Sequence, residues 1–246
     1  MCGRFALNAS QTDVENFFNT LVAHDFPPRF NIAPTEPVLV ISAPEFPRAE
    51  KSNLPAFDSH LVRWGFVPQW VKDFQSWPLT FNIRSETACV KKSFAVAMQY
   101  KRVIFPVSGF YEWKKQKSGV SHPHYITPKD GSLMGLAGLM ETWDSAEGSQ
   151  IDTAAILTKQ AEGELRNIHH RQPVILHQKD FARWLNVRQF FPRDVIDLFS
   201  TPNLDLDIFP VRAPHNTKAP EKIDYEEKQS QQKQKKEESK KQLNLF

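Results

Sequence analysis

The chain has 246 residues, 40% of them hydrophobic and 12% aromatic, which is enough for one sizeable globular domain. It has no run of about 18 apolar residues that would predict a membrane-spanning helix, and its first residues lack the basic and apolar regions of a secretory signal. Its two cysteines are too few for a disulfide framework or a four-cysteine zinc site, so we expect a cytoplasmic protein. The net charge of +3 does not by itself indicate nucleic-acid binding.

The predicted secondary structure favours strands over helices. Short β-rich runs bounded by Pro, Gly, Asp and Ser predict strands at 37–42, 60–66, 102–113, 124–128, 133–139 and 152–158. Helical patterns occur at Ser10–Leu21, with Ser10 as a candidate N-cap, from Glu86 onward, and at Gly163–Ile168, Lys179–Leu185 and Arg193–Phe199. Because the strands seldom alternate with the helices, we expect a compact α+β fold with mostly antiparallel sheets or a barrel-like core and flanking helices.

The composition changes near the C-terminus. Residues 1–222 have a globular composition, whereas residues 223–246 are rich in Lys, Glu and Gln and have few apolar side chains. Such a segment cannot bury enough apolar surface to offset its chain entropy, so we expect a disordered tail. Only its last five residues, QLNLF, break this polarity.

Cys2 is the first candidate for chemistry. Methionine before a small residue is normally removed, and the mature chain would then begin with Cys2. An N-terminal cysteine offers an α-amine with a pKa near ~7.7–8.0 and a thiol near ~8.5. Two reactions would use this pair: amide hydrolysis by an N-terminal nucleophile, or condensation with an aldehyde to a thiazolidine. Taken alone, Cys2 is also compatible with an ordinary second residue.

Several other polar residues interrupt apolar or aromatic stretches. Glu112 lies between Tyr111 and Trp113, and a carboxyl in such surroundings has a raised pKa that suits a general acid. His169 lies just before an apolar run. In isolation, Glu112 also fits a strand-end residue and His169 a structural hydrogen-bonding group. We expect no metal or other cofactor, because the pair His122 and His124 lacks a third ligand at suitable spacing.

Seven sequence strings in order resemble one family. They are MCGRF (1–5), FNIAPT (30–35), WGFVPQW (64–70), FNIRSET (81–87), RVIFPVSGFYEW (102–113), AGLMETW (137–143) and IHHRQPVIL (168–176). Together they resemble the SRAP family of abasic-site processing proteins, over roughly residues 1–217. The resemblance implies the compact, largely β fold of that family and a role in shielding abasic sites in single-stranded DNA.

The resemblance also implies roles for single residues. Cys2 would crosslink to the aldehyde of the abasic sugar, Asn82 would orient the ring and its new bonds, and Glu112 and His169 would move protons. Contacts to phosphates and bases near the lesion are implied for Arg4, Pro34, Trp70, Arg84, Lys92 and Arg171.

Two departures from the family pattern concern this site. The string often written HDRMP reads HHRQP here, which leaves the choice between His169 and His170 open. Family members often carry two adjacent tryptophans where this chain has Trp70 and Val71, so one stacking surface is missing from the sequence.

Three functions are compatible with these residues. The first is a thiol-dependent DNA–protein crosslink to abasic sites, in which phosphate-binding arginines and aromatic stacking make recognition independent of sequence. The second is an N-terminal-nucleophile peptidase or amidohydrolase that uses Cys2, Glu112 and His169. The third is a single-strand-binding module without catalysis.

The end of the tail predicts a protein partner. QLNLF resembles the short motif by which bacterial repair and replication proteins bind the sliding clamp. A disordered tether would present its apolar side chains to a pocket on the partner, and its glutamine would fix the register. The residues concerned are Gln242, Leu243, Leu245 and Phe246. This motif implies a bacterial protein recruited to stalled replication forks, and hence to the nucleoid during repair.

Overall fold

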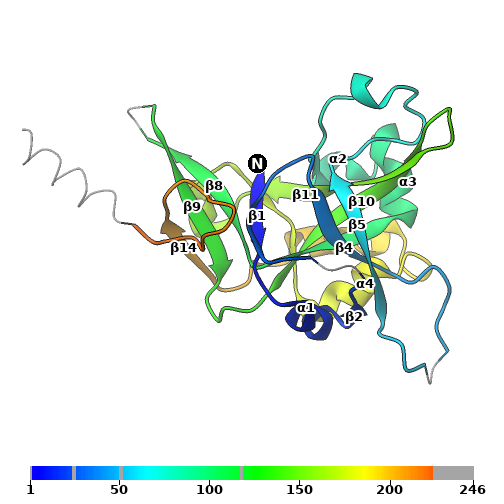
Figure 1. Cartoon of the computed structure of the whole chain (residues 1–246), viewed down its shortest axis with the longest axis horizontal. Coiled ribbons are helices and arrows are strands. Elements are labelled where there is room, and N and C mark those ends of the chain that lie inside the picture. The colour runs from blue at the N-terminus through cyan, green and yellow to red at the C-terminus, as the bar shows by residue number, and fades with distance from the viewer. Residues whose placement is uncertain (1, 24–25, 50–51, 117–118, 224–246) are drawn as a thin grey trace, which may run out of the picture.

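The computed structural model describes residues 2–23, 26–49, 52–116 and 119–223, which form two β-sheets with helices on their flanks (Figure 1). The predicted disorder of the tail and its terminal motif fall outside these residues. No helix in the described ranges is long and apolar enough to cross a membrane.

The smaller sheet contains five antiparallel strands and carries the N-terminal strand of the chain. Their order is β14 (Leu206–Pro210), β9 (Ser121–Pro128), β8 (Gly109–Lys115), β1 (Arg4–Leu7) and β3 (Arg29–Ile32). Strand β1 lies between the two sheets in Figure 1, so the N-terminal residues reach the junction of the two layers.

The larger sheet has nine strands and contains most of the core. Its main path runs through β12 (Arg171–Pro173), β11 (Gln150–Gln160), β10 (Met134–Asp144), β7 (Arg102–Val107), β4 (Pro37–Ser42), β5 (Phe57–Trp64) and β2 (Thr20–Leu21), with β13 (Ile175–Leu176) on β10 and β6 (Asn82–Arg84) on β11. Most pairs are antiparallel, but β11 pairs in parallel with β5 and β6, and β2 pairs in parallel with β5. Asn82 and Arg84 therefore lie beside the second half of β11.

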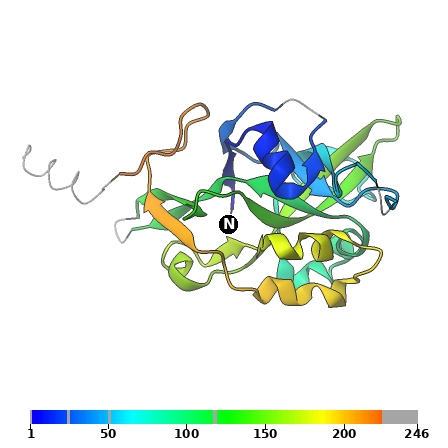
Figure 2. The same ribbon diagram turned by 90° about the horizontal axis from the view of Figure 1, so that it is seen from below.

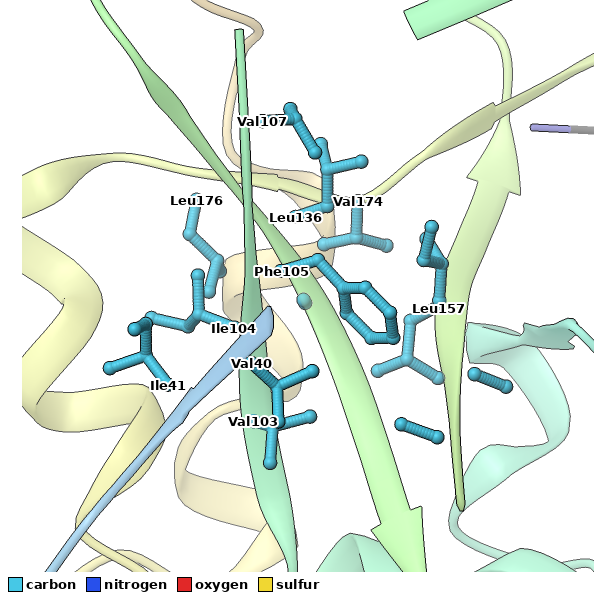
Figure 3. Packing of buried hydrophobic residues seen from close by; sticks show 14 of the residues in the cluster. Val40, Ile41, Val103, Ile104, Phe105, Val107, Leu136, Leu157, Val174 and Leu176 are labelled. Atoms are coloured by element: carbon cyan, nitrogen blue, oxygen red, sulfur yellow. The ribbon is translucent and has the colours of Figure 1, made fainter. Parts of the chain in front are cut away.

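The hydrophobic core lies against the central strands of this larger sheet. All six residues of β7 are buried, which agrees with the continuous apolar stretch in the sequence. Figure 3 shows Phe105 among apolar side chains from neighbouring strands, including Leu136 and Leu157. Phe5 on β1 joins this core, since its ring centroid lies 4.9 Å from that of Trp64. The strand next to Cys2 is therefore fixed by apolar packing.

The helices are short and lie at the periphery. They are α1 (Gln11–Phe18), α2 (Ser85–Ala88), α3 (Lys92–Tyr100) and α4 (Phe181–Leu185). In Figure 2 the C-terminal helical segments run along one side of the sheets, and α1 contacts them, since the rings of Phe18 and Phe181 stack with their centroids 5.2 Å apart. Ser10 caps α1 as predicted, because its side chain accepts from the backbone N–H of Asp13 in a capping box.

The α+β prediction is confirmed, with local differences. The helix predicted for Ser10–Leu21 stops at Phe18 because Asn19 adopts a left-handed conformation, after which Thr20 joins β5 as part of β2. The single strand predicted for 102–113 is two strands, since the chain passes from one sheet to the other at Ser108. The helices predicted at 163–168 and 193–199 are 3₁₀ turns.

Candidate functional site

Cys2 lies at the junction of the two sheets, directly before β1. The register pairs Arg4 with Tyr111, which brings the start of β1 beside Glu112 on β8. Cys2 is fully buried, and its thiol donates to the carbonyl oxygen of Arg4, with a sulfur–oxygen distance of 3.9 Å. Burial, together with the nearby negative charge of Glu112, raises the pKa of the Cys2 thiol well above its usual value. The thiol is thus held in its protonated form.

Asn82 connects the larger sheet to Cys2. Strand β6 places Asn82 opposite Ile156 of β11, and its Nδ2 donates to the Cys2 carbonyl oxygen at 2.9 Å. The Oδ1 atom of the same side chain is buried and has no hydrogen-bond partner among the residues that the structure describes. A buried amide oxygen without a partner is costly, so this atom is available to a ligand at Cys2.

Glu112 is the titratable group beside this pair. It lies on β8 between two aromatic residues and is only 3% exposed. Burial raises the pKa of its carboxyl from the usual value of 4.5 to about 7, because the charged form loses hydration. The carboxyl can therefore both donate and accept a proton near neutral pH.

His169 lies between the 3₁₀ turn Gly163–Asn167 and β12. Its Nδ1 lies 3.0 Å from the backbone nitrogen of Arg171 and 3.1 Å from the carbonyl oxygen of the same residue, so the backbone of Arg171 fixes the ring through Nδ1 in either tautomer. Partial burial lowers the pKa of His169, so the neutral ring predominates at pH 7. Its neighbour His170 is exposed and stacks close by, with the ring centroids 4.3 Å apart.

Arg171 is buried and engaged in contacts within the protein. Its side chain is 8% exposed, and both terminal nitrogens donate to the carboxylate of Glu86, one of them at 2.9 Å. The guanidinium also donates to the Thr158 carbonyl on β11. The family resemblance predicts that Arg171 contacts a phosphate. In the structure most of its N–H donors are engaged by Glu86 and Thr158, and these contacts connect β12 to β11 and α2.

The other predicted DNA contacts are exposed or half-buried. Arg4 is half-buried and donates to Asn31 at 3.0 Å. Arg84 and Lys92 are exposed at the starts of α2 and α3. Pro34 lies in the turn between β3 and β4, and Trp70 is 63% exposed. None of the five is fully buried.

Two residues without a predicted role belong to this region. Glu86 lies within the quoted string FNIRSET, but only the fold shows that it pairs with Arg171. Trp77 contacts Trp70 edge to face, with ring centroids 5.4 Å apart. A second tryptophan is therefore present beside Trp70 in space, although Val71 follows Trp70 in sequence and is buried.

Neither a larger cavity nor a metal-ligand cluster coincides with these residues. A cavity of about 1680 Å³ lies between β4, β5 and the α4 region, and none of the predicted site residues lines it. Within the described ranges, no group of three or more His, Cys, Asp and Glu side chains is arranged to hold a metal ion.

The Glu86–Arg171 pair predicts a pH effect on stability. The hydrogen bonds from Arg171 hold the pKa of the Glu86 carboxyl below its usual 4.5. The pair therefore stabilises the fold above that value, and this contribution is lost as the pH falls through the lowered pKa. We expect Glu86→Gln to reduce the free energy of unfolding at pH 7. Below about pH 5, the free energy of unfolding should decrease less steeply with falling pH in the variant than in the wild type. Urea unfolding at several pH values measures this, and parallel curves for the two proteins would contradict it.

Comparisons with known proteins identify the family of the chain. The family model described as "SOS response associated peptidase (SRAP)" matches residues 1–217. The chain is 34% identical over 196 residues to the abasic site processing protein YoqW of Bacillus subtilis, covering 78% of this chain and 83% of that one. It is 32% identical over 196 residues to the abasic site processing protein YedK of Escherichia coli, covering 75% and 79%.

Solved structures share the fold. A protein of Bacteroides thetaiotaomicron superimposes with a TM-score of 0.74 at 21% identity, over 86% of this chain and 92% of the other. A protein of Bordetella bronchiseptica gives 0.70 at 24% identity, over 86% and 100%. The family match over residues 1–217 and the identities above 30% lead to one conclusion: this chain belongs to the SRAP family.

Proposed function

We propose that this protein processes abasic sites in single-stranded DNA by forming a covalent thiazolidine through Cys2. The observation that carries the proposal is the convergence on Cys2 of a carboxyl with a pKa of about 7 and of an amide oxygen without a partner. The names of the relatives YoqW and YedK support the choice of substrate.

The proposed reaction begins after hydrolysis of the Met1–Cys2 peptide bond. The Cys2 α-amine attacks the sugar aldehyde at C1′ to give a carbinolamine, which loses its hydroxyl as water and becomes an imine. The sulfur then adds to C1′, and a proton goes to the nitrogen, which closes the five-membered ring. One water is released and nothing is oxidised or reduced. Removal of the imine blocks the β-elimination that would break the strand.

The elevated thiol pKa fits this order of steps. An α-amine with a pKa near ~7.7–8.0 is partly unprotonated at neutral pH, whereas burial keeps the Cys2 thiol protonated. The amine is therefore the first nucleophile, and the thiol reacts only once the imine carbon is positioned beside it. The same burial disfavours the alternative of a Cys2 peptidase, which needs a thiolate as its first nucleophile.

Each neighbouring group has a distinct task in the proposal. Glu112 protonates the hydroxyl that leaves the carbinolamine and accepts a proton when the sugar ring opens. His169 assists this transfer from Nε2. Asn82 fixes the Cys2 backbone through Nδ2 and accepts a hydrogen bond from the sugar or amine at Oδ1.

The strand itself is held by surface groups in the proposal. Arg4, Arg84 and Lys92 contact phosphates without reading sequence, and Trp70 and Pro34 offer apolar surfaces to bases. Arg171 contributes as a positioning residue, because it fixes the segment that carries His169.

Replacing the nucleophile separates crosslinking from binding. We expect Cys2→Ala to abolish the heat-stable adduct with an oligonucleotide that contains one abasic site, and to change noncovalent binding by less than a few fold. Cys2→Ser should still form an imine that borohydride traps. A denaturing gel and fluorescence anisotropy measure the two properties. A heat-stable adduct with Cys2→Ala would exclude the thiazolidine, and amide turnover without any adduct would favour the peptidase alternative.

Glu112→Gln tests the proton transfer. We expect it to slow crosslinking by roughly 10²–10⁴-fold, with binding preserved. Because the carboxyl has a pKa of about 7 and acts in its protonated form when water leaves, the wild-type rate should lose this contribution as the pH rises through 7. The variant should lack that descending limb. An unchanged rate and pH profile would leave Glu112 as a structural residue only.

The two adjacent histidines provide a matched pair of variants. We expect His169→Ala to slow crosslinking by roughly 10²-fold or more, and His170→Ala to have little effect, because only His169 is fixed by the backbone of Arg171. Single-turnover crosslinking rates measure both. A larger effect of His170→Ala would reverse the assignment.

We also propose that the tail binds the sliding clamp of a bacterial replication machinery through Gln242, Leu243, Leu245 and Phe246. The family match ends at residue 217, so these residues lie beyond the part shared with the family model. A peptide of residues 236–246 should bind a bacterial clamp with micromolar affinity in fluorescence anisotropy. A peptide with Leu245→Ala and Phe246→Ala should not bind, and equal affinity of the two peptides would contradict the proposal.

A further inference from the structure

A second, smaller cavity lies at the connection between β5 and β6. This connection contains the 3₁₀ turn Phe74–Ser76 and encloses a cavity of about 440 Å³. The volume falls within the roughly 300–1,000 Å³ that is typical of small-ligand pockets. Its lining is aromatic on one side, from Phe74 and Trp77, and polar at Arg63 and Thr80.

Two hydrogen-bond donors of this cavity have unused capacity. The Nε1 atom of Trp77 is buried and has no acceptor within the described part of the chain. The guanidinium of Arg63 lies over the Phe74 ring at 5.0 Å and donates to the Gly65 carbonyl at 3.2 Å. None of the described carboxylates forms an ion pair with Arg63, and burial lowers its pKa. The cavity therefore favours a planar ligand with oxygen or nitrogen acceptors.

The lining of the cavity ends two residues before Asn82 of the site at Cys2. Thr80 is one of the lining residues, and its carbonyl oxygen accepts the backbone N–H of Phe66 at 2.8 Å. Asn82 lies two residues after Thr80 in the chain. Trp64, next to Arg63, donates through its indole to the Phe81 carbonyl at 2.9 Å. The exposed ring of Trp70 contacts the edge of Trp77 at the rim. The lining of the cavity and Asn82, which contacts Cys2, therefore lie on one short segment of the chain.

We propose that this cavity receives one nucleobase of the single strand that carries the abasic site. The inference deepens the proposed function, because it places a second, noncovalent contact to the same strand. The base would lie against Phe74 and Trp77, and a carbonyl oxygen on its edge would accept from Trp77 Nε1 and Arg63. Thymine, guanine and cytosine have such an oxygen, whereas adenine does not.

Gly65 makes this arrangement possible. It adopts a φ of +149°, and a Cβ at this position would lie 2.5 Å from the Arg63 guanidinium and 2.9 Å from the Leu79 side chain. A residue with a side chain would therefore displace both groups at the cavity wall. The glycine lets Arg63 fold back over Phe74 and face the cavity.

The experiment measures noncovalent binding, so its outcome does not depend on the crosslink. All proteins carry Cys2→Ala, and the ligand is a single strand with a tetrahydrofuran analogue of the abasic site. A second base is removed at each position in turn, from three nucleotides before the lesion to three after it. We expect one position at which removal weakens binding by roughly 5- to 100-fold, as for the loss of one stacked base.

Variants at the cavity then assign that position. In Trp77→Ala, removal of that base should no longer weaken binding, while removal of a base at the other positions should have the same effect as before. Trp77→Phe, which keeps a ring but removes the N–H, should retain the stacking effect and lose the preference for thymine over adenine at that position. Tyr100→Ala is the control, because Tyr100 is likewise an aromatic residue at a cavity, but it lines the larger one. Urea unfolding checks that each variant is folded.

Two results would overturn the inference. The first is a base-removal profile that is the same for the parent Cys2→Ala protein and for its Trp77→Ala and Trp77→Phe variants. The second concerns Arg63→Gln. If this variant lowers the salt dependence of binding by about one phosphate contact, and the effect of removing each base stays the same, the cavity is a phosphate site. Failure of crosslinking in the Cys2 protein, with the base profile intact, would reject the thiazolidine and leave this inference standing.

Discussion

The hydrogen bond from Asn82 to the Cys2 carbonyl joins the two sheets at the point where the chemistry is proposed. Cys2 lies just before β1 of the smaller sheet, and Asn82 is the first residue of β6 in the larger one. Neither strand is long enough to be stable alone, since they have four and three residues. Both are held by longer neighbours, β8 and β11, so the site depends on how the two sheets pack together.

Burial at this junction acts on each group differently. It keeps the Cys2 thiol protonated, raises the pKa of Glu112 to about 7 and keeps His169 neutral. Removal of water therefore disfavours charge on all three groups. Such a site suits a reaction between neutral partners, such as amine, aldehyde and carboxylic acid, better than one that starts from a thiolate. The physical environment thus agrees with aldehyde condensation more closely than with peptide hydrolysis.

The sequence was most informative where apolar patterning is continuous. The run 102–113 predicts a strand; the structure divides it into β7, which is buried along its whole length, and β8. Short strands such as β1, β3 and β6 were not predicted, because three or four residues carry too little periodicity and are formed by pairing to distant segments. The family resemblance marked the site residues by type. It could not show that Arg171 is engaged by Glu86, or that Trp77 stands beside Trp70, since both are contacts between segments that only the fold brings together.

The position of β11 explains why these contacts coincide. One edge of β11 pairs first with β5 and then with β6, and the other with β10 and then with β12. Arg63 lies on β5 and Asn82 on β6, along one edge of β11. Arg171 lies on β12 along the other edge, and His169 just before it. The side chain of Arg171 crosses the strand to Thr158 and Glu86, so a shift of β12 would also move α2 and the Asn82 segment. A ligand that contacts both the connection between β5 and β6 and the segment before β12 would therefore stabilise one arrangement of all four segments. A single strand of DNA has the length and the repeated chemistry to make both contacts at once.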